Sequence, residues 1–172
     1  MADDINLHCH CPIFLQKVVI RISKNRHSKF NIDISEQGKQ KRTYKGIVYD
    51  SLLEMQFVKE YIEPKLKLGE IIKYDRQVVY QLQPEFIDRN GKKYRAINYK
   101  SDFDITYVNG DFRVIDIKGM LKNEDRLKEK MFKYHYPDID FNFVGRSIKD
   151  GGWIPLDQIL KARKQRKKNK TA

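Results

Sequence analysis

The chain has 172 residues, of which 34% are charged and 40% are hydrophobic, a balance typical of one water-soluble globular domain. Its formal net charge of +12 favours a polyanionic partner, with nucleic acid ahead of an anionic membrane surface. No apolar run approaches the roughly 20 residues that cross a bilayer, and no basic segment precedes the first apolar stretch. We therefore expect neither a membrane span nor a secretory signal.

The N-terminal motif HCHC, at residues 8–11, holds both cysteines of the chain. Two cysteines separated by one residue do not suggest a disulfide framework, so a reducing cytoplasm is the expected compartment. The four side chains are too crowded for one tetrahedral zinc site. A weakly ordered end is favoured over metal binding, which stays the alternative.

Three segments precede the first clear helix. Residues 13–22, IFLQKVVIRI, are rich in β-branched side chains and predict a strand. Residues 23–45 are polar and basic, and they predict a loop or arm rather than a core element. Residues 46–50, GIVYD, predict a short second strand.

Residues 51–70 predict the first helix, because apolar side chains recur near the helical period. Ser51 and Glu54 match a capping box at its start, and Pro64 is expected to kink or end it. The periodic apolar positions are Leu52, Leu53, Phe57, Tyr61 and Ile62.

Strand-like sequence follows this helix. Residues 71–87 are rich in Ile, Val and Tyr, and Asn90–Gly91 predicts a turn into a return strand at residues 94–100. Residues 101–120 predict a second hairpin, turned at Asn109–Gly110.

The last part of the chain alternates helix and strand. Residues 123–136 predict a helix ended by Pro137, residues 140–145 predict a strand, and Pro155 starts a last helix. That helix runs into a tail with seven Lys or Arg between residues 161 and 170. The order of elements predicts layers of the α/β or α+β kind. One face of the helix at 123–136 holds Leu127, Met131 and Tyr134.

Side chains alternate across a strand, so Asp102 and Asp104 share one face of the second hairpin, and Asp116 and Lys118 share one face of its return strand. A two-residue loop would place these acidic faces on opposite sides of the sheet. A three-residue loop at residues 109–111 would pair Asp102 with Lys118 and Asp104 with Asp116. Burial favours the three-residue loop, because it gathers on one face Phe103, Ile105, Ile115 and Ile117.

Convergent carboxylates repel one another, and a divalent cation removes that conflict. Carboxylate oxygens are the ligands that Mg²⁺ prefers, and Mn²⁺ is expected to substitute for it. Beside a metal-bound water and a phosphate, the ammonium of Lys118 can orient the nucleophile or offset developing negative charge. The competing interpretation is an exposed cross-strand ion pair, worth under about 1 kcal/mol.

The segments YDSLLE, YKSDF and VIDIKG, followed by the basic helix RLKEKMF, resemble the restriction-endonuclease-like nucleases with the PD-(D/E)xK signature. Over residues 29–144 the chain looks most similar to small phage-type endonucleases identified as Holliday-junction resolvases. The resemblance implies an α/β fold with a restriction-endonuclease-like core, in which helices flank a central mixed, mostly antiparallel sheet. We accordingly expect an N-terminal extension (1–25), a nuclease domain (26–158) and a basic C-terminal tail (159–172).

By the same resemblance, Asp102 matches the metal-binding aspartate of the first strand, and Asp116 and Lys118 match the acid and the lysine of the signature triplet. The backbone carbonyl of Ile117 would be a further metal ligand. Glu54 matches the glutamate that many of these nucleases add from their first helix, although the capping box also accounts for it.

Two positions depart from the family pattern. Ser101 stands where proline often precedes the first aspartate, and the helix after the triplet lacks the Gln-x-x-x-Tyr pattern of exonuclease-like relatives.

The resemblance implies a Mg²⁺-dependent DNA endonuclease, selective for branched DNA and acting in phage recombination or DNA processing in the host cytoplasm. An enzyme that cuts two symmetric strands is expected to be a two-fold dimer. One alternative is a non-catalytic nucleic-acid-binding module with a degenerate nuclease fold. The other is a phage structural protein whose charges are simple surface.

Basic residues outside the triplet predict contacts with DNA phosphates, through a basic arm at residues 24–45, the helix after the triplet and the C-terminal tail. The competing interpretation is a solvated helix face and a solubilising end. The candidate contacts are Lys41, Arg42, Lys45, Lys128, Lys130, Arg163, Lys164, Arg166 and Lys167.

Overall fold

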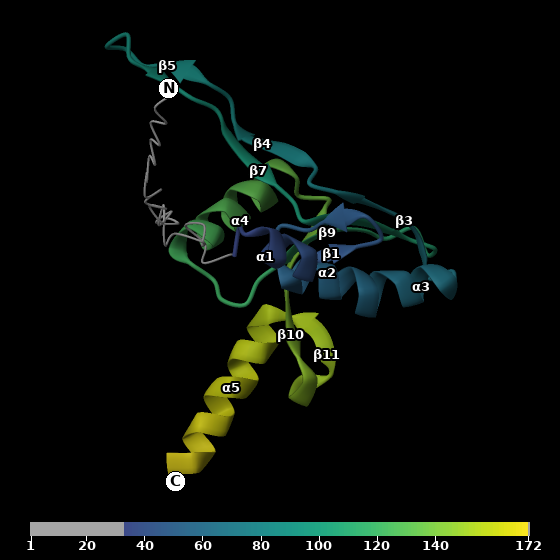
Figure 1. The fold of residues 1–172 in the computed structure, drawn as a ribbon. Coiled ribbons are helices and arrows are strands. Elements are labelled where there is room, and N and C mark those ends of the chain that lie inside the picture. The colour runs from purple at the N-terminus through teal and green to yellow at the C-terminus, as the bar shows by residue number, and fades with distance from the viewer. Residues whose placement is uncertain (1–32, 172) are drawn as a thin grey trace, which may run out of the picture.

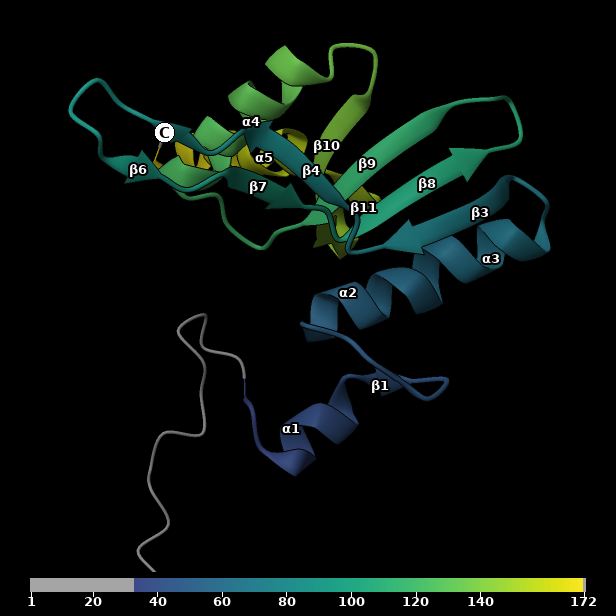
Figure 2. The same ribbon diagram turned by 90° about the horizontal axis from the view of Figure 1, so that it is seen from above.

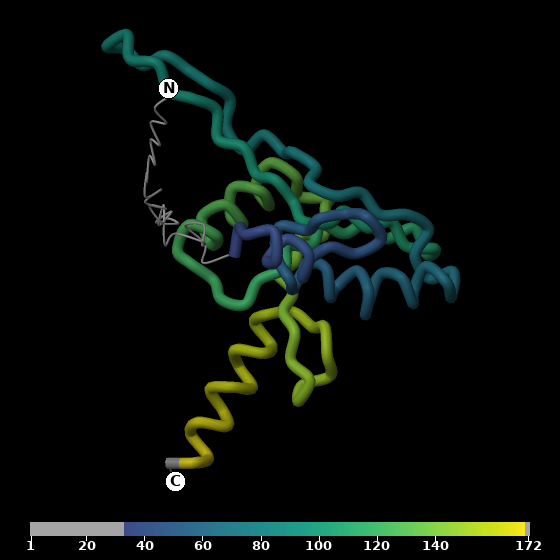
Figure 3. The backbone as a smooth tube through the Cα atoms, viewed as in Figure 1, coloured from purple at the N-terminus to yellow at the C-terminus, as the bar shows by residue number. Residues whose placement is uncertain are grey.

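The computed structural model describes residues 33–171. The predicted strand at residues 13–22, the HCHC motif and the first part of the predicted basic arm lie outside the described residues. Within the described part, Figures 1 and 3 show a central body from which a long β-hairpin and the last helix project in different directions.

A five-stranded sheet forms the centre of the fold, in the strand order β11-β10-β9-β8-β3. Neighbouring strands are antiparallel except for β9 and β10, which run parallel. The predicted mixed α/β architecture with a mostly antiparallel central sheet is therefore confirmed. The strands are β3 (Ile71–Arg76), β8 (Phe103–Tyr107), β9 (Phe112–Ile117), β10 (Asp140–Ser147) and β11 (Gly152–Pro155).

One helical segment covers the first face of the sheet. It consists of α2 (Leu52–Phe57), the π-helix η1 (Val58–Ile62) and α3 (Glu63–Lys67) in direct succession. Of the two outcomes expected at Pro64, an end of the helix does not occur, because the segment continues to Lys67, with an irregular π-turn just before the proline. At the end of the π-turn, the Glu63 N–H bonds the Val58 carbonyl, five residues back. The next residue, Pro64, has no N–H to donate, and the π-turn accommodates it. The core beneath this segment contains Tyr49, Phe57, Val58, Ile62, Phe103, Ile105, Ile115 and Ile117.

The opposite face is covered by α4 (Asn123–His135), by α5 (Leu156–Thr171) and by a hairpin of β4 (Val79–Gln83) and β7 (Ile97–Lys100). Figure 2 shows α4 and α5 across the sheet from α2 and α3. Consecutive side chains of a strand point to opposite faces of the sheet. Because each face carries a core, neighbouring residues of β8 and β9 are both buried. The second core contains Leu82, Tyr99, Val114, Phe132, Phe141, Phe143, Leu156 and Ile159.

The predicted loop at residues 23–45 is wrong where the structure describes it. The side chain of Ser35 accepts the Gly38 N–H and caps α1 (Glu36–Lys41), after which β1 (Thr43–Tyr44) and β2 (Ile47–Val48) form a small hairpin. In the sequence Gly38 suggests a loop, but in the structure it allows α1 to pack closely against Asp33. A Cβ at this position would lie 2.4 Å from the Asp33 carbonyl oxygen.

The predicted apolar face of α4 also differs from the structure. Phe132 is fully buried, whereas Leu127 and Tyr134 are 59% and 82% exposed. The C-terminal residues continue α5 as a helix, whose first turns bury Leu156 and Ile159 against β10. A short 3₁₀ helix, η2 (Ile148–Asp150), links β10 to β11. No helix within residues 33–171 combines the length and the apolar character needed to cross a membrane.

Candidate active site

The β8–β9 hairpin sets the geometry of the acidic residues. Its loop is residues 108–110, because the Tyr107 N–H bonds the Asp111 carbonyl at 2.9 Å and Gly110 takes a positive φ of 87°. This loop begins one residue earlier than the predicted loop at 109–111. The parity of the two strands is unchanged, but their pairing is shifted by two residues.

The acids of the two strands share one face of the sheet, as the parity argument predicts. The ladder pairs Asp104 with Val114, and its continuation sets Asp102 opposite Asp116. The predicted pairing of Asp102 with Lys118 and of Asp104 with Asp116 is therefore wrong. The two acids expected to bind metal face each other directly.

Asp116 is the buried centre of this group, with 4% of its surface exposed. The Tyr99 hydroxyl donates a 2.8 Å hydrogen bond to its Oδ2, and Lys118 Nζ lies 2.9 Å from its Oδ1. The lysine contact is an ion pair, and Oδ1 has no hydrogen bond from any residue that the structure describes. A further ligand on Oδ1 would therefore share this oxygen with the lysine ammonium.

Asp102 lies just before β8 and is held by the backbone of the neighbouring strand. Its Oδ2 accepts the Ile117 N–H at 2.7 Å. Burial, followed by the charges of Asp116 and Glu54, holds the pKa of Asp102 well above its usual range, and the Ile117 and Lys118 contacts offset only part of this. The three carboxyl groups are thus close enough that simultaneous ionisation is disfavoured.

Glu54 joins the site from the first turn of α2. The half of the predicted capping box in which Ser51 caps α2 is confirmed, since the Ser51 hydroxyl accepts the Glu54 N–H at 3.1 Å. The same hydroxyl donates to the Glu54 carboxylate at 2.7 Å. Glu54 is buried, and this burial raises the pKa of its carboxyl group. Capping and a place beside Asp102 are therefore compatible roles.

Lys118 lies just beyond β9, where its N–H bonds the Val144 carbonyl at 2.9 Å. Its ammonium is also 4.0 Å from Asp125 at the start of α4. Burial of the Lys118 side chain opposes its charge, but Asp116 and Asp102 outweigh burial and raise the pKa of the ammonium. Lys118 is consequently a permanent cation beside the acids.

The group is not a finished metal cluster. In residues 33–171, no three His, Cys, Asp or Glu side chains are already arranged around a common ion position. Both oxygens of Asp116 face protein groups, so a cation has to share or displace the Lys118 contact. The donors still fit a hard divalent ion, because they are carboxyl groups whose mutual repulsion, seen in the raised pKa of Asp102, a further cation would relieve.

A second buried aspartate lies nearby on the same face. Asp104 accepts a hydrogen bond from the Tyr80 hydroxyl, and burial raises the pKa of its carboxyl group. Tyr80 is paired with Tyr99 across β4 and β7. One hairpin therefore supplies a hydroxyl to Asp104 and another to Asp116. Sequence reasoning missed both tyrosines, because their only signal is an inward position in a strand.

The predicted DNA-binding residues lie on three separate elements of the described chain, the α1–β2 region, α4 and α5. Arg42 donates to the Asp33 carbonyl at 2.5 Å. Lys41, Lys130, Arg163, Lys164 and Lys167 are exposed. Three others contact carboxylates at 2.5–2.9 Å, in the pairs Lys45–Glu63, Lys128–Glu124 and Arg166–Asp150.

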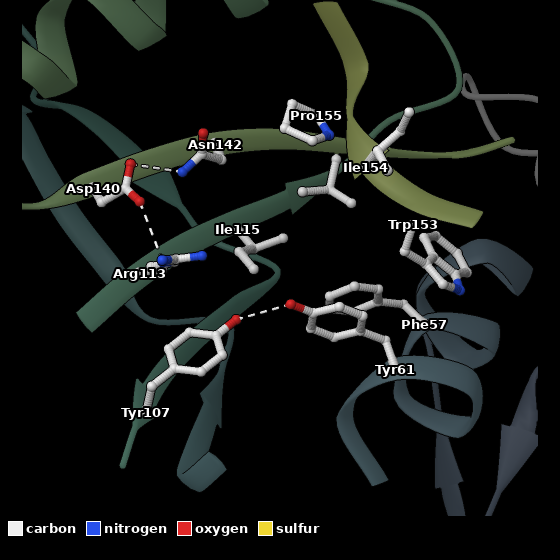
Figure 4. Close-up of a pocket in the computed structure, with 11 residues that line it drawn as sticks. Phe57, Tyr61, Tyr107, Arg113, Ile115, Asp140, Asn142, Trp153, Ile154 and Pro155 are labelled. Carbon is white, nitrogen blue, oxygen red and sulfur yellow. Dashed lines mark hydrogen bonds and ion pairs between the residues drawn. The ribbon is translucent and has the colours of Figure 1, made fainter. Parts of the chain in front are cut away.

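A pocket of about 220 Å³ lies on the other face of the sheet, between η1 and β11. Figure 4 shows its aromatic walls and the hydrogen bond of 3.2 Å between the hydroxyls of Tyr61 and Tyr107. Its polar groups are paired with one another, and none of the predicted catalytic residues lines it. Its walls are formed by Phe57, Tyr61, Tyr107, Arg113, Ile115 and Trp153.

Comparison with known proteins gives one family. The family described as "Protein of unknown function (DUF1064)" matches residues 34–152. No curated protein matches the chain. The matched span runs from α1 into β11 and includes Glu54, Asp102, Asp116 and Lys118. Because the match covers more than half of the sequence, this chain belongs to the DUF1064 family.

Proposed function

We propose that the chain is a Mg²⁺-dependent DNA endonuclease with a PD-(D/E)xK site on a restriction-endonuclease-like core, selective for branched DNA as a Holliday-junction resolvase is. One observation carries the proposal. Asp102 faces Asp116 across two strands, Glu54 adds its charge to theirs, and Lys118 Nζ lies 2.9 Å from Asp116. The net charge of +12 supports a polyanionic substrate.

Glu54, Asp102 and Asp116 would hold the ion, with the Ile117 carbonyl as a further ligand. When bound, the ion supplies Lewis-acid activation of the scissile phosphodiester and of a water molecule. The Lys118 ammonium can orient that water and offset negative charge on the phosphate. The Ile117 N–H keeps Asp102 in place by a hydrogen bond that does not depend on metal.

The second candidate function is a non-catalytic nucleic-acid-binding module. The contact between Lys118 and Asp116 favours it, because a structural ion pair would neutralise the acid in the same way. For a resolvase, a two-fold dimer would bring two such sites to symmetric strands.

A panel of labelled substrates tests the proposal. Four-way junction, flap, single-stranded and duplex DNA are incubated with wild type and with Asp116→Asn, in Mg²⁺ and in EDTA. We expect wild type to cut a branched substrate only with Mg²⁺, and Asp116→Asn to bind the same DNA without cutting it. Binding by wild type without cleavage in Mg²⁺ or Mn²⁺ would replace the nuclease with the binding module.

A further inference from the structure

Residues 84–96, here called the β-arm, project from the body of the molecule (Figures 1 and 2). Its strands, β5 (Phe86–Ile87) and β6 (Lys93–Tyr94), pair only with each other within the described chain. An isolated two-stranded hairpin is marginally stable in water, and the side chains of Phe86, Ile87 and Tyr94 are 45%, 67% and 37% exposed. The β-arm therefore presents a long, partly apolar surface to a partner.

The charges of the β-arm indicate the kind of partner. It carries four basic side chains and two acidic ones, a net charge of +2. Both acids are engaged within the β-arm: Glu85 pairs with Lys93 at 3.1 Å, and Asp88 accepts two backbone N–H groups of the turn at 2.9 Å. The basic side chains without an acidic partner among the described residues are Arg89, Lys92 and Arg95.

Aromatic rings lie among these cations. The rings of Phe86 and Tyr94 stack with centroids 4.9 Å apart, and Lys92 Nζ lies 5.0 Å over the Tyr94 ring. A projecting hairpin with exposed cations suits nucleic acid, because its ammonium and guanidinium groups attract phosphates. A second copy of the chain suits this surface less, because two β-arms of the same charge repel each other.

We propose that the β-arm binds the DNA substrate beside the cleavage site, with Arg89, Lys92 and Arg95 on phosphates. The proposal rests on the proposed function for the identity of its partner. Strand β7 leads from the β-arm directly to Asp102, ten residues after Lys92. At about 3.3 Å per residue, the turn lies at most about 33 Å from the acids, roughly one turn of duplex. The β-arm can therefore reach the substrate up to about ten base pairs from the cut.

The test compares two triple variants that each remove three exposed positive charges. The β-arm variant is Arg89→Gln/Lys92→Gln/Arg95→Gln, and the control is Lys67→Gln/Lys73→Gln/Lys149→Gln. Fluorescence anisotropy measures their binding to labelled 30-base-pair and 8-base-pair duplexes in Ca²⁺, over a range of salt concentrations. Circular dichroism verifies that both variants are folded.

On the long duplex, we expect the β-arm variant to bind about tenfold or more weakly at 0.1 M salt and to lower the salt slope by about one per lost phosphate contact. The control should stay within about twofold of wild type, and the β-arm variant should lose less affinity on the short duplex than on the long one. Equal affinities of the two variants on the long duplex would overturn the proposal. The proposal would also be overturned if sedimentation showed that wild type and the control are dimers, that the β-arm variant is not, and that the β-arm variant binds DNA as the control does.

The two proposals fail in different ways. If wild type cuts branched DNA and the β-arm variant cuts long and short substrates as the control does, the β-arm proposal fails and the nuclease stands. If the β-arm variant loses DNA binding but wild type never cuts, the nuclease fails and the β-arm proposal stands.

Discussion

Tyr99 donates a 2.8 Å hydrogen bond to Asp116 from a strand outside the central sheet. Both side chains are buried, and burial together with the charge of Asp116 raises the pKa of the Tyr99 hydroxyl far above its usual range. The hydroxyl therefore remains a donor at any working pH. It orients the carboxylate from the root of the β-arm, while Lys118 contacts the other oxygen.

Tyr99→Phe should lower the turnover number of the nuclease and leave the fold intact. The substitution removes a hydrogen bond to a charged group, worth about 1.5–3 kcal/mol, which corresponds to roughly 10- to 100-fold in rate. The optimum Mg²⁺ concentration should also rise, because Asp116 loses its fixed orientation. The matched control is Tyr136→Phe, whose hydroxyl donates to the Gln81 carbonyl at 3.1 Å. Equal rates for the two variants would show that Tyr99 has no positioning role.

Lys118→Met should abolish cleavage without abolishing DNA binding. A preorganised charge at the reacting phosphate is typically worth 10²–10³ in rate, so we expect a loss of about 100-fold or more. Single-turnover cleavage measures this loss, and anisotropy in Ca²⁺ measures binding. Lys133→Met, which breaks the 2.7 Å contact with Glu129 on α4, is the control and should cut nearly as wild type. Substantial cleavage by Lys118→Met would remove the lysine from the chemistry.

Asp102→Asn should stabilise the metal-free protein at neutral and alkaline pH. Because the pKa of Asp102 is raised in the folded state, its contribution to stability is complete below the unfolded pKa of about 4 and is lost as the pH rises. Thermal unfolding in EDTA should therefore show no difference at pH 4 and a growing advantage of the variant towards pH 8. Asp138→Asn, on an exposed loop, controls for the loss of one charge. A stability difference between the two proteins that does not change with pH would contradict the repulsion of Asp102 by the neighbouring acids. Equal stabilisation of wild type and Asp102→Asn by Mg²⁺ would contradict it as well.

Gly145→Ala should destabilise the fold at the contact between β10 and α5. An added Cβ would lie 2.9 Å from Leu156 Cδ1, 3.0 Å from Ile159 Cδ1 and 3.2 Å from the Lys118 carbonyl oxygen. Overpacking of this kind typically costs about 1–3 kcal/mol, measurable by urea unfolding. Gly119→Ala is the control, because its Cβ would lie 3.9 Å from Leu53 Cδ1, an ordinary contact distance. Equal midpoints would mean that the packing at Gly145 is loose.

Much of the fold could be predicted from sequence patterns that involve neighbouring residues. Ser51 and Glu54 predicted the start of α2, and the two Asn-Gly pairs predicted both hairpins, because capping and turn chemistry depend on neighbouring residues. Strand parity predicted that the acids share a face. The exact pairing was missed, since a loop one residue earlier moves every partner by two positions.

Contacts between distant elements could not be predicted in this way. The pairing of Tyr80 with Tyr99 depends on an irregularity between Gln81 and Gln83, which shifts the register set by the Asn90–Gly91 turn. The sequence does not reveal that shift, so it does not show which tyrosine meets which aspartate. The helix at Glu36–Lys41 was missed because Gly38 suits both a loop and a close contact, and sequence alone does not distinguish them.

Relaxation of a supercoiled plasmid that carries a cruciform-forming inverted repeat, and therefore a branch point, tests the central claim most directly, because one nick in thousands of base pairs is detected. Wild type and Asp116→Asn are compared at equal concentration, in Mg²⁺ and in EDTA, with circular dichroism to verify that both are folded. The facing carboxylates of Asp102 and Asp116 predict nicking by wild type in Mg²⁺ alone and none by the variant. Nicking that persists in Asp116→Asn, or wild type that binds the plasmid and leaves it supercoiled in Mg²⁺ and Mn²⁺, would contradict the account.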